Sequence, residues 1–257
     1  MKFFTAVPFT NAEETVRNIK SALATTKVVQ LLSAPPEIDM KKFFEGLADS
    51  IGNYYDVNED LETGGIQEGR WIDITYDPNV PNRYRSSNTR QPLHTDASYY
   101  PIDNNIQYFY CASHAYLGGA TTFIDTKLVV ESMLVDGRED LLNRLQHTPV
   151  HFSKFVRNKT KPILMKDGDD WRVNFNYYCL DKNISSEVKA LADEFFEFLE
   201  TRIQNAGLFT PVNLQTREAV FFHDEKVMHG RNAFFARTPA ERSLIKGTII
   251  EWENRLS

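Results

Sequence analysis

The chain has 257 residues, of which 42% are hydrophobic, 12% aromatic and 25% charged, so it can bury a large core and is not predicted to be disordered. A formal net charge of -6 argues against a nucleic-acid partner recognised through its phosphates. The two cysteines lack Cys-x-x-Cys spacing, which disfavours a disulfide framework or a zinc cluster. No long apolar run or signal segment occurs, so we expect a cytoplasmic protein without a membrane partner.

The amino-terminal part of the sequence reads as helix, strand and helix. Residues 13–25 predict a helix, and residues 28–31 predict a short buried strand that stops before two prolines. Apolar residues recur at helical spacing over residues 39–51, and a glycine follows as a helix stop. Two polar, aperiodic stretches, 59–70 and 76–91, are expected to be long loops of the kind that carry function.

Strand-like runs dominate the remainder of the chain, with helical insertions near 127–146 and 186–205. The β/α alternation of a doubly wound sheet is absent. We therefore predict one domain over residues 1–257, mainly β with helical insertions, built as a β-barrel or jelly roll. The strands are expected at 106–112, 121–125, 150–155, 171–175, 219–222 and 244–252.

Two of the six histidines stand in segments that suggest a metal centre. His94 and Asp96 lie two residues apart in QPLHTDASYY, and in an extended segment such residues point to the same face. His229, in EKVMHGRNAF, would complete two imidazoles and one carboxylate, the set that leaves open positions in non-haem Fe(II) oxygenases. On its own, His-x-Asp also fits a surface histidine beside a turn. A zinc hydrolase is disfavoured because no His-Glu-x-x-His pattern occurs.

The surrounding pattern resembles the taurine dioxygenase and clavaminate synthase-like family of Fe(II)/2-oxoglutarate oxygenases. QPLHTDASY is similar to that family's proximal His-x-Asp segment, and LGGATTFID, which contains Thr121, is similar to its Gly-Gly-x-Thr segment. EAVFFHDEKVMHGRNAF resembles the distal histidine segment, and Arg242 in ERSLIKGTI matches a basic residue beyond it. The resemblance extends from about residue 39 to the carboxyl terminus and implies a double-stranded β-helix, the cupin-like form of a jelly roll.

The resemblance also implies the cofactor chemistry. Fe(II) would be bound by His94, Asp96 and His229, and 2-oxoglutarate by Thr121 and Arg242, with O₂ as the second co-substrate and succinate and CO₂ as products. An arginine fork suits a carboxylate anchor, and Arg237 is the fallback candidate for it. Because the aspartate is retained, halogenation is disfavoured and hydroxylation or desaturation is expected.

The substrate is less well indicated. Arg90 lies where related enzymes contact a polar substrate, although a solvated loop arginine is an equal alternative, and Tyr99 could line the cavity or belong to the core. Lys246 could face substrate or solvent, and residues 174–177 could supply hydrogen bonds or form a turn. The remaining four histidines are expected to be ordinary ones.

The leading hypothesis is a hydroxylase acting on an unactivated C–H bond of a free amino acid or a similar small polar metabolite. The alternatives are a desaturase or other oxidative tailoring enzyme of a natural-product intermediate, which could be carrier-tethered, and a non-catalytic jelly-roll binding module.

Overall fold

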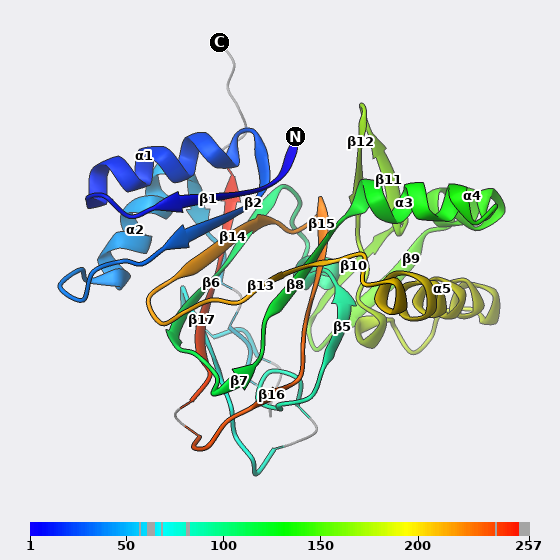
Figure 1. Ribbon diagram of the computed structural model, residues 1–257. Coiled ribbons are helices and arrows are strands. Elements are labelled where there is room, and N and C mark those ends of the chain that lie inside the picture. Colours follow the sequence, from blue (N-terminus) through cyan, green and yellow to red (C-terminus); the bar gives the residue numbers. More distant parts are fainter. Residues whose placement is uncertain (57, 61–64, 68, 81–82, 240, 252–257) are drawn as a thin grey trace.

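The computed structural model describes residues 1–257 except 57, 61–64, 68, 81–82, 240 and 252–257 (Figure 1). Two sheets form its centre. The larger has seven strands in the order β1 (Lys2–Pro8), β2 (Thr26–Leu32), β14 (Ala219–His223), β6 (Asn105–Ser113), β17 (Ser243–Glu251) and β3 (Gly52–Tyr54), with β4 (Ile72–Thr75) also paired to β17. The smaller has the order β13 (Thr210–Val212), β8 (Thr121–Asp125), β15 (Val227–Arg231) and β5 (Gln91–His94).

Side chains that alternate along the strands of the larger sheet face two different apolar clusters. In β14, Ala219 and Phe221 face one apolar cluster, while Val220 and Phe222 face another. The second cluster also contains Phe123 from the smaller sheet, so it is the core between the two sheets. This two-residue period is the expected signature of strands buried on both faces.

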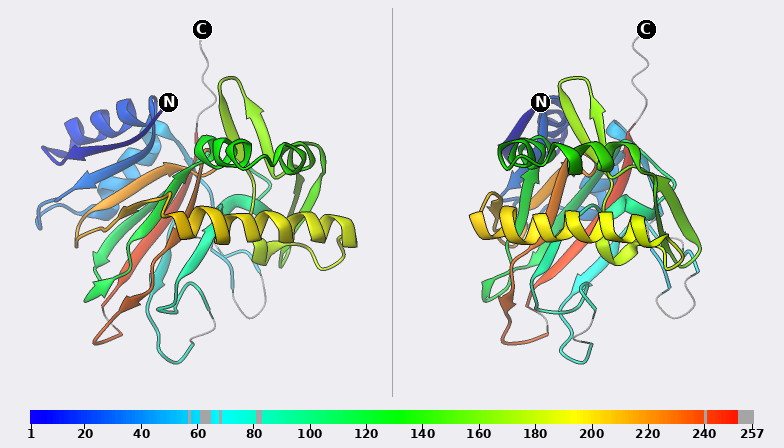
Figure 2. Two further views of the ribbon diagram at one scale, coloured as in Figure 1. Left: turned by 45° about the vertical axis from the view of Figure 1, so that its right-hand side comes forward. Right: turned by 90° about the vertical axis from the view of Figure 1, so that its right-hand side faces the viewer.

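Helices cover the two outer sides of the strands (Figures 1 and 2). Helices α1 (Ala12–Leu23) and α2 (Met40–Ile51) pack on the outer face of the larger sheet, and Asp39 caps α2 by accepting hydrogen bonds from the amides of Lys41 and Lys42. A third apolar cluster lies on the other side of the molecule. Around it pack two hairpins and the helices α3 (Thr126–Val135), α4 (Glu139–His147) and α5 (Ser186–Phe198). These hairpins are β9 (Val150–Lys154) with β10 (Arg157–Lys161) and β11 (Leu164–Asp167) with β12 (Asp170–Val173).

The remaining elements are short. They are the pair β7 (Leu117–Gly118) and β16 (Phe234–Phe235), the 3₁₀ turns η1 (Asp96–Tyr99) and η2 (Tyr177–Cys179), and the π-helical turn η3 (Leu199–Gln204) that extends α5. No helix in the described part of the chain is long and apolar enough to cross a bilayer.

The predicted fold class is confirmed: two opposed sheets with helical flanks match a double-stranded β-helix. Most predicted helices and strands are present with small shifts of their ends, and the first insertion is split into α3 and α4. Strand β1 was not predicted. It joins the larger sheet parallel to β2, an interaction between segments that a local pattern does not show. That residues 1–257 form a single domain stays a prediction.

Candidate functional site

A cavity of about 470 Å³ is lined by residues of both sheets. Strand β5, η1, β15 and β17 contribute to its inner end, where His94, Asp96 and His229 are found. Aromatic side chains from loops, short turns and helix α5 form much of its wall, among them Tyr84, Tyr99, Tyr100, Phe155, Tyr178 and Phe196. The cavity is thus a polar centre within a largely aromatic enclosure.

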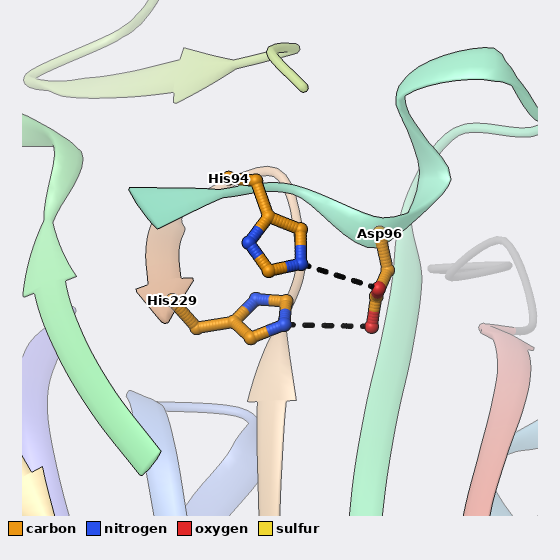
Figure 3. A group of neighbouring side chains, drawn as sticks. All are labelled: His94, Asp96 and His229. Atoms are coloured by element: carbon orange, nitrogen blue, oxygen red, sulfur yellow. Dashed lines mark ion pairs between the residues drawn. The ribbon is translucent and has the colours of Figure 1, made fainter. Parts of the chain in front are cut away.

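Strand pairing brings the two histidines together. Strands β15 and β5 are antiparallel, with His229 directly opposite His94, and the ring centroids are 4.3 Å apart. The extended reading of the segment expected His94 and Asp96 to lie in one strand. In the structure they do not, because β5 ends at His94 and Asp96 begins η1. The turn still directs the carboxylate toward both rings, as Figure 3 shows.

The donor atoms of these three side chains fit one small metal ion. His94 Nε2 is 3.6 Å from Asp96 Oδ1, and His229 Nε2 is 3.5 Å from Asp96 Oδ2. One ligand atom from each side chain lies within 4.8 Å of the other two. The His94 Nδ1 atom is 2.8 Å from the carbonyl oxygen of Pro92, so Nδ1–H donates to it and Nε2 keeps its lone pair for a metal.

The electrostatics of the group also suit a metal. Burial lowers the pKa of His229 to about 3, so its imidazole is neutral and able to donate a lone pair. Burial alone would raise the pKa of Asp96, but the Lys246 ammonium and the two histidines hold it well below its usual range. Lys246 Nζ lies 2.8 Å from Asp96 Oδ2, and the two residues form an almost enclosed ion pair. The centre therefore offers a carboxylate anion and a neutral His229 imidazole, with the Nε2 atom of His94 as the third donor.

A glycine permits the close approach of the strands that carry the histidines. A Cβ atom on Gly230 would lie 2.7 Å from the carbonyl oxygen of Gln91 in β5 and 3.1 Å from Thr122 Oγ1 in β8. Any other residue would therefore force β15 away from its neighbours. This contact explains why glycine follows His229.

Arg242 is a buried cation without a partner anion. Its side chain is 5% exposed, Nε has no hydrogen-bond partner, and no described carboxylate lies within ion-pair distance. Burial, followed by the nearby charge of Arg231, lowers the pKa of Arg242 to about 9. Arg242 lines the cavity together with Thr121, which is 4% exposed. Such a guanidinium fits a carboxylate-bearing ligand, because an anion would supply the missing hydrogen bonds.

A second polar group also lines the cavity. Glu59, 6% exposed, pairs with Lys154 at 2.9 Å and with Arg157 at 3.4 Å. Tyr99 lines the cavity here, and its hydroxyl is 3.1 Å from Lys154 Nζ and 3.4 Å from Glu59 Oε2. Arg85 adds another cation to the cavity lining, held by a bond from its Nε to the carbonyl oxygen of Asp73.

Two arginines singled out from the sequence point elsewhere. Arg90 is absent from the cavity lining and forms a two-point ion pair with Glu200 in η3. The structure thus gives no support to its expected contact with substrate, which stays a prediction. Arg237, the fallback anchor, is 67% exposed at the side chain and pairs with Glu241.

The other polar candidates are mostly structural. Asn174 is buried and donates to the carbonyl oxygen of Ser98, whereas Asn176 and Tyr177 line the cavity. The four further histidines each bond to a backbone or hydroxyl oxygen and lie in no metal-binding group within the described residues: His114, His147, His151 and His223.

Sequence reasoning missed Glu59 and Asp224. Glu59 lies in an aperiodic loop with no signal for its burial. Asp224 lies in the polar turn ahead of His229, and its carboxylate accepts hydrogen bonds from the backbone amides of Asp96 and Ala97. An acidic residue in that turn was the available signal.

Comparison with known proteins agrees with this geometry. Among solved structures of similar fold, an asparagine oxygenase in complex with Fe(II), 3-hydroxyasparagine and succinate superimposes with a TM-score of 0.69 at 11% identity, covering 93% of this chain and 78% of that one. PvcB from Pseudomonas aeruginosa has a TM-score of 0.64 at 16% identity, with 96% and 86% covered. The oxygenase OrfP with Fe and alpha-ketoglutaric acid has a TM-score of 0.63 at 13% identity, with 95% and 80% covered.

No curated protein matches the sequence. Residues 5–248 match the family described as "Taurine catabolism dioxygenase TauD, TfdA family". With that match over nearly the whole chain, the protein belongs to the TauD/TfdA family and is an enzyme, an oxygenase dependent on Fe(II) and 2-oxoglutarate.

Proposed function

We propose that His94, Asp96 and His229 bind the Fe(II) ion. The observation that carries this assignment is the convergence of three donor atoms within 4.8 Å at the inner end of the cavity, the one such group among the described residues. Two imidazoles and one carboxylate on one side of an ion leave positions for a bidentate co-substrate and O₂. The Asp96 side chain keeps 17% of its surface exposed toward the cavity, so the site is accessible from there.

We propose that Arg242 and Thr121 hold 2-oxoglutarate. Arg242 can form two parallel bonds to the carboxylate that lies farther from the metal, and the Thr121 hydroxyl can donate another. When bound, iron, 2-oxoglutarate and O₂ supply the oxidising power for attack on an unactivated C–H bond, with release of succinate and CO₂. The contribution of the chain is to orient the substrate and to exclude water within the aromatic wall.

We propose that the substrate is a free amino acid or a similar small metabolite with a flat or apolar side chain. The cavity lining presents both signs of charge away from the metal ligands, a carboxylate on Glu59 and cations on Lys154 and Arg85, which suits a zwitterion. The aromatic side chains that line the cavity favour an apolar side chain on such a small polar metabolite. The asparagine oxygenase structure holds 3-hydroxyasparagine and an OrfP structure holds a hydroxylated arginine, and these amino-acid ligands support the class.

One observation favours a second reaction. PvcB is described as an oxygenase from an isonitrile synthetic pathway, so a similar fold serves natural-product tailoring. The same centre in this chain could desaturate or otherwise tailor an amino-acid-derived intermediate, free or carrier-bound. Product mass separates the two reactions, because hydroxylation adds one oxygen and desaturation removes two hydrogens.

The proposal includes a reducing, cytoplasmic location. Cys111 and Cys179 are both buried and unpaired, and burial raises the pKa of each thiol to about 12, so neither is a reactive thiolate. Unpaired buried thiols fit a reducing compartment.

The test is an anaerobic titration of the metal-free protein with Fe(II) and 2-oxoglutarate, followed by turnover with a panel of amino acids. Chelation of the metal by 2-oxoglutarate should produce a weak visible charge-transfer band that is lost in His229→Ala. Aromatic and large aliphatic amino acids should raise succinate formation above the uncoupled background. Absence of the band would contradict the metal assignment, whereas a band without coupled turnover would contradict the substrate class alone.

A further inference from the structure

Asp224 lies in the tight turn between β14 and β15. This turn leads into the strand that carries His229 and lies against η1, which begins with Asp96. The Asp224 side chain is fully buried. In the part of the chain that the structure describes, no lysine or arginine lies within ion-pair distance of it. A buried carboxylate without a countercharge is costly unless its oxygens accept hydrogen bonds. The groups that bond to the Asp224 carboxylate therefore indicate its role.

Both carboxylate oxygens of Asp224 bind the start of η1. The backbone amide of Asp96 donates to Oδ1 at 2.9 Å, and that of Ala97 donates to Oδ2 at 2.8 Å. Thr95, the residue at the cap position of η1, directs its side chain to the backbone of Phe175 and forms no capping bond to the turn. Asp224 thus supplies the cap for this turn from a distant part of the chain, and it fixes the backbone from which the Asp96 carboxylate projects.

The same carboxylate faces the distal histidine. Asp224 Oδ1 lies 4.0 Å from His229 Nδ1, a buried nitrogen with no hydrogen-bond partner. An anion on this side favours the tautomer with hydrogen on Nδ1. That tautomer leaves the lone pair on Nε2, the atom that faces Asp96 at 3.5 Å. Metal binding at Nε2 makes Nδ1–H more acidic and so strengthens its attraction to the carboxylate.

We propose that Asp224 is a positioning residue for two of the three proposed metal ligands. It holds the Asp96 turn through two hydrogen bonds from backbone amides, and it orients the His229 ring through the charge that faces Nδ1. The inference rests on the proposed metal ligands and adds the group that orients them. Without Asp224, η1 loses its cap and His229 is free to adopt either tautomer, so two of the three donors lose their fixed direction.

The experiment is a Co(II) titration of metal-free wild type, Asp224→Asn and Glu225→Gln, read by the visible absorption of Co(II), whose intensity depends on coordination geometry. Asparagine keeps the shape but turns an NH₂ group toward a backbone N–H. The Co(II) affinity of the Asp224→Asn variant should fall by about 10- to 100-fold, the usual effect of losing a group that orients a metal ligand.

Glu225→Gln is the matched control. Glu225 is the next residue and is 4% exposed, but it pairs with Lys159, Lys161 and Arg172 on another side of the turn. This variant should lower the thermal midpoint of the metal-free protein and leave the Co(II) affinity and spectrum unchanged. An equal loss of Co(II) affinity in Glu225→Gln would overturn the inference, since the effect would then be one of general stability.

The outcomes separate this inference from the metal assignment. If wild type shows no Co(II) bands that depend on His229, the ligand assignment and this inference both fall. If wild type binds and Asp224→Asn binds equally well with the same spectrum, only the inference falls. Should Asp224→Asn not fold, ¹⁵N-correlated NMR of the histidine rings in metal-free wild type decides: hydrogen on Nδ1 of His229 supports the role, and hydrogen on Nε2 overturns it.

Discussion

Replacing Arg242 by Met should weaken 2-oxoglutarate binding without weakening the fold. Arg242 is 5% exposed and has no described anion beside it, so in the metal-free protein its guanidinium is a desolvated charge whose burial is offset mainly by the Phe234 ring, 5.2 Å away. Methionine has a similar length and no charge. The thermal midpoint of the ligand-free variant should therefore equal or exceed that of wild type, the opposite of the usual effect of changing a buried residue.

The size of the binding effect follows from the bonds that would be lost. Hydrogen bonds to a charged group contribute about 1.5 to 3 kcal/mol, and about 1.4 kcal/mol corresponds to a tenfold change in affinity, so the dissociation constant for 2-oxoglutarate should rise by about 10- to 150-fold. The affinity for Fe(II) alone should not change, because Arg242 is not among the proposed metal ligands.

The assay is an anaerobic 2-oxoglutarate titration of the Fe(II)-loaded protein, followed by the charge-transfer band. Arg237→Met is the matched control, since Arg237 is exposed and pairs with Glu241 outside the cavity. Unchanged 2-oxoglutarate affinity in Arg242→Met, or an equal loss in Arg237→Met, would refute the assignment of the anchor.

Three further changes test the metal centre. Asp96→Ala should abolish substrate oxidation while circular dichroism shows an intact fold; native-level turnover would remove Asp96 from the ligand set. Burial lowers the pKa of His229 to about 3, below the 6.5 of an ordinary histidine. As the pH falls, the His229 imidazole is therefore protonated in the unfolded state before it is protonated in the folded state. Stability from the neutral ring is thus present above about pH 6.5 and is lost toward pH 3, by up to about 1.4 kcal/mol per pH unit. In His229→Gln the thermal midpoint of the metal-free protein should fall less between about pH 7 and about pH 5, and equal slopes would contradict this. Gly230→Ala should weaken Co(II) binding and destabilise the fold by about 1 to 3 kcal/mol, because its Cβ would lie 2.7 Å from the Gln91 carbonyl oxygen; wild-type values in urea unfolding and Co(II) titration would show that the strands can separate without consequence.

Much of the fold followed from local patterns. The apolar residues of α2 recur at helical spacing, and the glycine expected to end the helix, Gly52, follows its last residue. Strand β8 has its predicted bounds because its apolar run ends at Asp125, which caps α3. Strand β1 was not foreseen, because its place depends on pairing with β2 rather than on its own residues.

The sequence by itself determined which residues are candidates for the centre, since His94, Asp96, His229 and Arg242 stand in recognisable segments. Only the tertiary structure decided how each is used. Arg90 and Arg242 are chemically alike, but one meets Glu200 on a neighbouring turn while the other is enclosed without an anion. The carboxylate of Asp224 matters because two sheets bring it against a turn formed 128 residues earlier. Charge and hydrogen-bonding capacity are properties of a residue, whereas burial and partners depend on contacts between distant segments, and these contacts form only when the chain folds.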